Sequence, residues 1–314
     1  MRGQLLIGCV LAVAACLVKP LVPAQAQSED QTRARCEDNN PDISIEGCTA
    51  LIQSGQETDS NLASAFYNRG KAYHYKGQID LAIADLTQAI QLKPDYADAF
   101  AGRGYLYNGK GQYDLGIADL TQAIQLKPDD ATTFVNRGNA YDNKGQYDLA
   151  IADENTAIKL KPDYAEAFNG RGIVYDDKGQ YDLAIADYTK AIQLKPDDAD
   201  AFNNRGVAYD NKGQYDLAIA DYTQAIKLKP DDANAFNNRG FAYLGKGLYD
   251  LAIVDYTQAL QLKPDFVAAF NGRGNAFSHI SEHDLAVVDY RAALALDPKD
   301  KSARRGLKRL GAAP

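Results

Sequence analysis

Residues and motifs that often mark enzymes are scarce in this sequence of 314 residues. It contains only three histidines, His74, His279 and His283, and isolated histidines on helices are usually structural or solvated. It also lacks a glycine-rich phosphate loop and the nucleophile elbow of hydrolases. His279, Glu282 and His283 have helical metal-ligand spacing, but the turn at Ser281 disfavours a metal site. We therefore expect no catalytic residue, no metal and no cofactor.

Positive charge and long apolar runs are scarce as well. Lysine and arginine number 34 against 42 acidic residues, a net charge of −8 that becomes −10 without residues 1–26. This balance argues against nucleic acid as a partner, because phosphates attract basic surfaces. The one long apolar run, from Leu5 to Val18, has 14 residues, whereas a membrane-spanning helix needs roughly 20.

The amino terminus has the pattern of a secretory signal. Arg2 precedes the apolar run, and Ala24-Gln25-Ala26 supplies the small residues that signal peptidase requires. The pattern predicts a signal peptide over residues 1–26, cleavage before Gln27, and an exported protein of the bacterial periplasm or secreted medium. An alternative is a lipobox at residues 13–16, in which Cys16 becomes a lipid-anchored first residue.

Cleavage leaves two of the four cysteines, Cys36 and Cys48, in a chain bound for an oxidising compartment. We expect them to form a disulfide that joins the two helices of a degenerate pair within residues 27–60. A metal site would need more ligands nearby, and a redox site would favour a tighter C-x-x-C spacing.

Proline is sparse but strictly periodic. Of 11 prolines, seven recur at intervals of 34 residues. They are Pro94, Pro128, Pro162, Pro196, Pro230, Pro264 and Pro298. The chain is therefore better described as repeats than as globular domains.

Residues 165–198 illustrate one repeat as two helices. The apolar positions of its first half recur at spacings of three and four, and Gly179 is expected to end that helix in a left-handed cap. Asp182 is expected to cap the second helix, which Pro196 ends, and Asp197 is expected to cap the helix after it. One hairpin of this size cannot bury its apolar face alone, so neighbours must stack.

The pattern resembles the tetratricopeptide repeat (TPR). The matching positions are Phe168, Gly172, Tyr175, Ala184, Tyr188, Ala191 and Pro196. The resemblance implies an all-α, right-handed solenoid of seven units over residues 61–298, followed by a capping helix in residues 299–314. Glu154 departs from the pattern because other units have tyrosine or leucine there, so this unit is expected to be looser or wetter.

An arginine recurs where the family usually has leucine, and an aspartate recurs 16 residues later. The seven pairs are Arg69 and Asp85, Arg103 and Asp119, Arg137 and Asp153, Arg171 and Asp187, Arg205 and Asp221, Arg239 and Asp255, and Arg273 and Asp289. The strict use of arginine predicts a ladder of structural ion pairs, since only a guanidinium presents a planar fork. The alternative is a row of arginines that lines a groove for anionic ligands.

The resemblance also implies a concave groove, lined by the first helix of each unit, that holds a segment of another protein. The predicted groove residues are Asn136, Asn169, Asn203, Asn204, Asn237, Asn238, Asn271, Tyr105 and Phe241. Carboxamides both donate and accept, so an asparagine ladder suits a peptide backbone. Alternatively, the asparagines satisfy local backbone groups or solvate a face.

Acidic groove positions, including Asp98, Asp142, Glu166, Asp176 and Asp210, outnumber the single basic one, Lys71, and favour a neutral or basic partner. The chain is thus predicted to be an exported protein-binding scaffold. Two alternatives remain open: a lipid-anchored envelope assembly factor, and an accessory or glycan-binding module of an enzyme complex.

Overall fold

The computed structural model describes residues 24–313, and this part of the chain contains seventeen α-helices and no strand. The predicted all-α fold is therefore confirmed. The helices fall into two compact units, one ending at Pro94 and the other beginning at Asp95, which we describe separately. The predicted signal segment lies outside the described residues except for Ala24 to Ala26, which begin the first helix.

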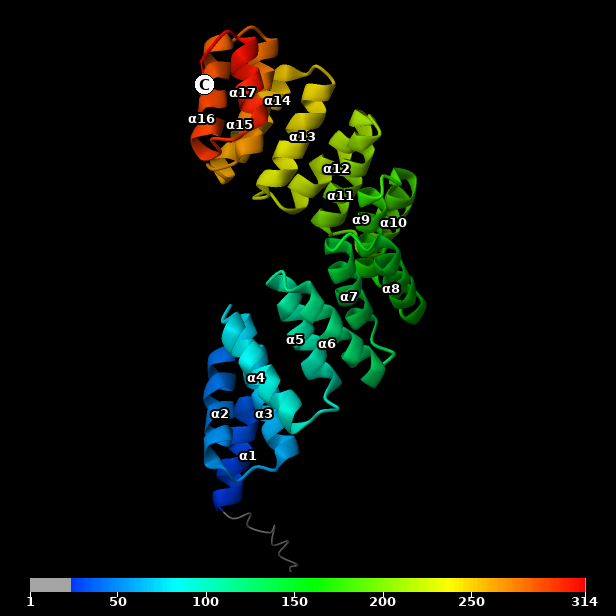
Figure 1. The fold of residues 1–314 in the computed structure, drawn as a ribbon, viewed down its shortest axis with the longest axis vertical. Helices are drawn as coiled ribbons and strands as arrows, with labels where there is room; N and C mark the ends of the chain where they lie inside the picture. Colours follow the sequence, from blue (N-terminus) through cyan, green and yellow to red (C-terminus); the bar gives the residue numbers. More distant parts are fainter. Residues whose placement is uncertain (1–23, 314) are drawn as a thin grey trace, which may run out of the picture. The chain divides into compact units, whose positions relative to one another are not determined.

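The first unit contains two helical hairpins (Figure 1). Its helices are α1 (Ala24–Cys36), α2 (Pro41–Ser54), α3 (Asp59–Tyr75) and α4 (Ile79–Leu92). The predicted disulfide between Cys36 and Cys48 is formed and joins α1 to α2. Both cysteines are buried in a small core with Leu51 and Ala65, so the bond holds α1 against α2.

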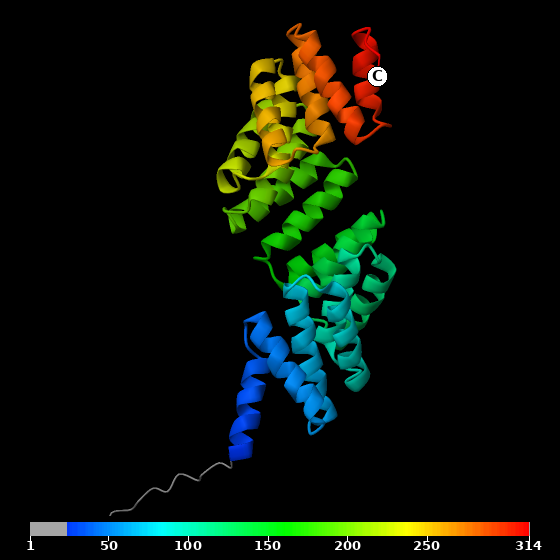
Figure 2. The ribbon, with the colours of Figure 1, turned by 90° about the vertical axis from the view of Figure 1, so that its left-hand side faces the viewer.

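The second unit repeats one hairpin six times and adds a last helix. Its helices are α5 (Ala97–Gly109), α6 (Tyr113–Leu126), α7 (Ala131–Asn143), α8 (Tyr147–Leu160), α9 (Ala165–Asp177), α10 (Tyr181–Leu194), α11 (Ala199–Asn211), α12 (Tyr215–Leu228), α13 (Ala233–Gly245), α14 (Tyr249–Leu262), α15 (Val267–His279), α16 (His283–Leu296) and α17 (Lys301–Arg309). Each hairpin packs against the next one along the chain (Figures 1 and 2). We call the odd-numbered helices α5 to α15 the A helices and the even-numbered helices α6 to α16 the B helices.

The turn inside each hairpin of the second unit depends on a residue with positive φ. Gly179 follows the last residues of α9 with a φ of 71°, as predicted for a left-handed cap. Ser281 occupies the same position in the last hairpin with a φ of 67°, which makes it the one non-glycine residue with positive φ among residues 24–313. The last hairpin therefore carries backbone strain that the others avoid.

Two of the predicted helix caps were wrong. Gln180, not Asp182, is the N-cap of α10, and its side chain makes no capping bond. Asp182 instead forms an ion pair with Lys212 of the next hairpin. At α11 the cap is Asp198, one residue later than predicted, and its carboxylate accepts from the backbone N–H groups of Asp200 and Ala201. Several acidic residues lie close together near the starts of these helices, so the sequence pattern alone does not show which of them is the cap.

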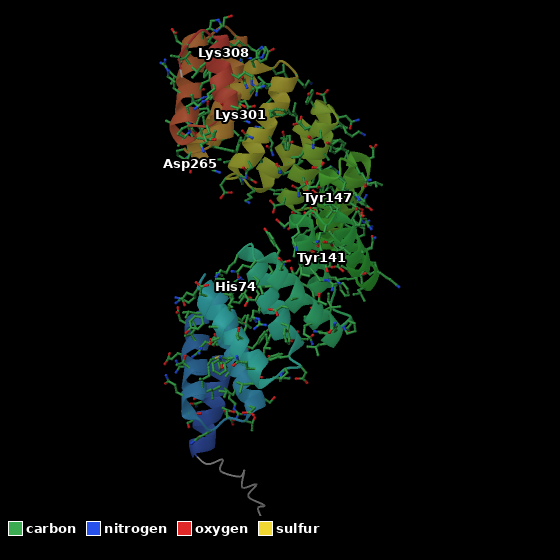
Figure 3. All side chains as sticks on the ribbon, in the orientation of Figure 1. His74, Tyr141, Tyr147, Asp265, Lys301 and Lys308 are labelled. Carbon is green, nitrogen blue, oxygen red and sulfur yellow. A yellow bond between two sulfur atoms is a disulfide. The ribbon has the colours of Figure 1, made fainter. Side chains whose placement is uncertain are left out.

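Alternating small and large residues build the core of the second unit. Alanines such as Ala184 and Ala191 are fully or almost fully buried, and so is the ring of Tyr188. A Cβ added to Gly172 would lie 2.7 Å from that ring, so glycine is required where helices α9 and α10 meet. At the end of the unit, α17 covers α16 with Ala303 and Leu307, both fully buried. Its basic side chains, Lys301 and Lys308 among them, are exposed (Figure 3).

Candidate partner-binding surface

The structure brings each predicted arginine together with its aspartate. In all seven pairs the arginine Nε and Nη2 donate to the two carboxylate oxygens over 2.7 to 2.9 Å. The aspartates are buried and the arginines are mostly buried, as for Arg205 and Asp221, whose side chains are 17% and 8% exposed. Two parallel hydrogen bonds of this kind need a guanidinium, which explains why lysine never occurs at this position.

Five arginines of the second unit also donate to the preceding repeat, a contact that our sequence analysis missed. In four hairpins of the second unit the arginine Nη1 donates to a threonine Oγ1 of the hairpin before it, over 3.0 to 3.1 Å. These threonines, Thr121, Thr189, Thr223 and Thr257, recur with the repeat and were the available signal. Arg171 is the exception, since it donates to Asn155, which replaces the threonine. The ion pairs therefore link repeats as well as helices.

Aromatic rings complete the environment of the guanidinium groups. The Cζ atom of Arg205 lies 5.7 Å from the ring centre of Phe202 and 5.9 Å from that of Tyr209. The hydrogen bonds that Arg205 donates to Asp221 raise the pKa of Arg205 above its ordinary value. The Nε, Nη1 and Nη2 atoms of Arg205 thus all have hydrogen-bond partners within the protein.

A second ladder of ion pairs, which the sequence analysis also missed, joins exposed residues of neighbouring hairpins. In each pair, a lysine just after an A helix contacts an aspartate at the start of the B helix of the preceding hairpin. Lys178, just after α9, contacts Asp148 at the start of α8 over 2.7 Å. The equivalent pairs are Lys144 with Asp114, Lys212 with Asp182, and Lys246 with Asp216. The aspartates are 82% to 92% exposed, so solvent screens these contacts strongly.

The predicted asparagines of the groove form hydrogen bonds with one another. Asn204 of α11 donates to Asn169 of α9 over 3.3 Å, and Asn238 of α13 donates to Asn203 of α11 over 3.1 Å. Asn237 in turn donates to its neighbour Asn238. These five side chains are partly exposed, so they form a carboxamide surface over three consecutive A helices. We call Asn169, Asn203, Asn204, Asn237 and Asn238 the asparagine ladder.

The remaining predicted groove residues lie at the ends of this ladder. Tyr105 on α5 is 48% exposed and Phe241 on α13 is 55% exposed. Asn136 on α7 accepts a bond at its backbone carbonyl from Asn108 of α5. Asn271 on α15 differs from the others because it is buried, and its Nδ2 donates to Asp300 beside α17.

Carboxylates occupy one repeated position of the A helices in three consecutive hairpins, as Asp142, Asp176 and Asp210. Each is about half buried, and burial raises their pKa values, to about 6 for Asp142 and Asp210. The neighbouring charge of Asp177 raises the pKa of Asp142 further. Two other acidic residues of the predicted groove have a lysine nearby. Lys127 lies 3.6 Å from Asp98, and Lys195 lies 3.6 Å from Glu166.

Glu154 is fully buried, whereas the sequence led us to expect a looser or wetter unit around it. Neither of its carboxylate oxygens has a hydrogen-bond partner. Burial raises its pKa well above the ordinary value, and Asp153 adds to this while Arg171 lowers it. Burial without hydrogen-bond partners therefore disfavours the ionised form of this carboxyl group. Among residues 24–313, no cluster of His, Cys, Asp or Glu side chains has an arrangement that suits a metal ion.

Comparison with known proteins identifies the repeat. A TPR model matches residues 70–111, 104–145, 138–177, 174–213 and 211–247, and a second tetratricopeptide repeat model matches residues 233–266. The chain belongs to the tetratricopeptide repeat family. No curated protein shows significant similarity to it.

Several solved structures share the fold. YrrB, described as a TPR protein with an unusual peptide-binding site, is 24% identical with a TM-score of 0.50, over 60% of this chain and 97% of that one. A chain of the APC/C hetero-tetramer Cut9–Hcn1 is 20% identical with a TM-score of 0.68, over 90% of this chain and 54% of that one. A tetratricopeptide repeat protein of Parabacteroides merdae is 19% identical with a TM-score of 0.62, over 79% of this chain and 98% of that one.

Family membership gives the general role of the chain. TPR proteins are scaffolds for protein–protein interaction and typically have no catalytic activity, so the partners of this one are proteins or peptides. In the described part of the chain, every helix is too short or too polar to span a bilayer. The partly exposed surface of the A helices in the second unit is the candidate site for a partner.

Proposed function

We propose that the chain is an exported bacterial scaffold that holds an extended segment of another protein against the A helices of its second unit. The asparagine ladder carries this proposal. Its carboxamides are linked to one another over 3.1 to 3.3 Å yet stay partly exposed, so they present donors and acceptors in fixed positions. A peptide backbone offers the complementary donors and acceptors regardless of its side chains.

The charge of the surface favours a neutral or basic segment. Asp176 and Asp210 lie on α9 and α11, which carry part of the ladder, and Asp142 lies on α7. Arg205 beneath the surface is paired with an aspartate. A segment with several acidic side chains would meet like charge on α7, α9 and α11. Lys127 and Lys195 offset part of this charge near Asp98 and Glu166, so binding does not require a strongly basic partner.

Peptide selection tests the scaffold role directly. A phage-displayed library of random peptides would be selected on the purified protein, and the affinity of selected peptides measured by calorimetry. The double variant Asn203→Ala, Asn237→Ala should weaken binding at least about fivefold, because each lost hydrogen bond contributes about 0.5 to 1.5 kcal/mol. The matched control is Leu183→Ala, Leu217→Ala, two half-exposed positions on B helices. Equal affinity for both double variants would exclude the asparagine ladder as the binding surface.

The export step has its own test. Mass spectrometry of the mature amino terminus distinguishes a start at Gln27 from an acylated Cys16. A Gln27 start supports a free periplasmic or secreted scaffold. An acylated Cys16 would replace that location with a membrane-anchored one, without changing the proposed binding surface.

A further inference from the structure

A pocket opens at the carboxyl-terminal end of the same surface. It has a volume of about 480 Å³ and lies among α13, α14, α15 and α17. Its apolar lining includes Phe241, Leu244 and Val267, and its polar lining includes Asn237, Asn271 and Asn275. This volume is in the range of sites that hold a small ligand or a large side chain.

Asn271 gives the pocket a defined hydrogen-bonding requirement. Its side-chain amide donates to Asp300 Oδ1 over 3.0 Å, and Asp300 Oδ1 also accepts from the backbone N–H of Ala303. Because an ionised carboxylate only accepts, the Nδ2 of Asn271 must be the group that faces Asp300. The Oδ1 of Asn271 is then fixed elsewhere, and it is buried without a partner.

The unpartnered oxygen is costly unless a ligand satisfies it. A buried acceptor without a donor costs about 1 to 3 kcal/mol, so a ligand that supplies an N–H or O–H group recovers this energy. A ligand without a donor would leave the cost in place. The apolar lining adds a second requirement, because Leu244, Val267 and the half-exposed Phe241 favour an aliphatic or aromatic group.

Tyr256 also lines the pocket and is itself almost fully buried. A Cβ added to Gly272 would lie 2.3 Å from Cζ of its ring, so only glycine allows α15 to approach it. Asp300 is the only charged residue in the lining, and it is already bonded to Asn271 and Ala303. Nothing in the lining would favour an anionic group.

We infer that this pocket takes one large apolar side chain of the bound segment, whose own backbone N–H donates to Asn271 Oδ1. This inference rests on the proposed function and sharpens it, because it fixes one position of an otherwise sequence-tolerant site. The partner then carries leucine or an aromatic residue, without acidic neighbours, at the point where its segment reaches α15.

The test uses N-acetyl-leucine N-methylamide as the probe and saturation-transfer NMR on the purified protein. An analogue in which an ester oxygen replaces the leucine N–H has the same shape but no donor at that point. We expect the amide to bind about threefold to tenfold more tightly than the ester. Equal binding of the two probes would overturn the role of Asn271.

Pocket-filling variants locate the binding. Ala268→Phe fills the pocket from α15, and Ser302→Trp fills it from α17, so either one should abolish the signal of the amide. Asp200→Phe, at the position equivalent to Ala268 two repeats earlier, should leave it unchanged. Circular dichroism would show that each variant folds, and two variants from different helices guard against one that does not. Full binding to both folded pocket variants would overturn the inference, as would binding of N-acetylglucosamine in place of the amide.

The two proposals can fail separately. If library-selected peptides bind Ala268→Phe as tightly as the unaltered protein, the pocket inference fails while the scaffold proposal stands. If no peptide is selected although the amide probe binds as described, the pocket stands and the scaffold proposal fails.

Discussion

At two places in the second unit, a side chain of a B helix lies between glycines of two A helices, and we call each place a joint. The two joints have the same flanking glycines but a different central residue. At one, Glu154 of α8 lies between Gly138 and Gly170, and at the other, Tyr256 of α14 lies between Gly240 and Gly272. Both central side chains are almost entirely excluded from solvent. The glycines are equally close in both joints, since an added Cβ would lie 2.3 to 3.1 Å from the central side chain.

The difference lies in how the two side chains meet the core. Tyr256 fills its site with an aromatic ring, whereas both oxygens of Glu154 are buried without partners. Burial of a carboxyl group without hydrogen bonds is unfavourable even when it is protonated. The comparison shows that the repeat tolerates a poor core residue because the ion pairs and alanines around it are retained.

The largest effect should come from the ion pairs that both joints share. Arg171→Leu beside Glu154, and Arg273→Leu beside Tyr256, each leave a buried aspartate without its partner. We expect each to lower the free energy of unfolding by ~3–5 kcal/mol, measured by urea denaturation. If either variant were as stable as the unaltered protein but bound peptide more weakly, the arginines would be ligand-binding rather than structural groups.

Exchange of the two central residues should have the next largest effect. Glu154→Tyr should raise the stability by about 1–3 kcal/mol, because it removes two unpartnered oxygens and the flanking glycines leave room for a ring. The reverse change, Tyr256→Glu, should lower it by at least as much. Thermal unfolding of both variants checks this, and a destabilised Glu154→Tyr would mean that Glu154 has a partner or a function we have not identified.

The pH dependence should also distinguish the joints. Burial raises the pKa of Glu154, and Asp153, Asp142 and Asp187 add to this while Arg171 opposes it. A folded-state pKa above the unfolded value means that the native state binds more protons, so this contribution to stability is present at low pH and is lost as pH rises. For Asp142 and Asp210, which behave alike, the loss runs from about pH 4 to about pH 6.

We therefore expect the stability difference between Glu154→Gln and the unaltered protein to grow in favour of the variant as pH rises from 4 to 7. Glutamine keeps the size of the side chain but does not titrate. Urea unfolding at several pH values measures the difference. A difference that stayed constant over this range would show that Glu154 is ionised in the folded protein.

The smallest effect should come from the outer ion pairs. Asp148 pairs with Lys178 near Glu154, whereas near Tyr256 the position equivalent to Lys178 is Ile280. Lys178→Ile makes the first joint resemble the second, and we expect a loss of at most about 0.5 kcal/mol because Asp148 is 92% exposed. Addition of salt should reduce this loss further, and a loss above 2 kcal/mol would show that the outer ladder stabilises the stack.

The sequence predicted what the 34-residue period determines. The hairpins, the turn at Gly179 and the partners of the seven arginines follow from this spacing. The Cys36–Cys48 disulfide was predicted separately, from the pair of cysteines left in a chain expected to be exported. It did not predict contacts between repeats, such as Arg205 with Thr189 or Lys178 with Asp148, because these depend on how neighbours stack. It also misplaced Asp182 and Asp197, since several adjacent acids can each cap a helix.

The candidate site was predictable in kind but not in detail. The resemblance to the tetratricopeptide repeat assigned the asparagines to one surface, but their bonds to one another and the burial of Asn271 depend on side-chain packing. The pocket at α15 could not be predicted from the repeats, because it depends on the position of α17, which lies outside the repeat pattern.

The central claim is that the A helices of the second unit hold another polypeptide. A photoreactive phenylalanine in place of Asn203 or Asn237, and in place of Leu183 as the control on a B helix, would be irradiated with a library-selected peptide and the products mapped by mass spectrometry. The account predicts crosslinks from positions 203 and 237 and none from position 183. Crosslinks from position 183 alone would contradict it.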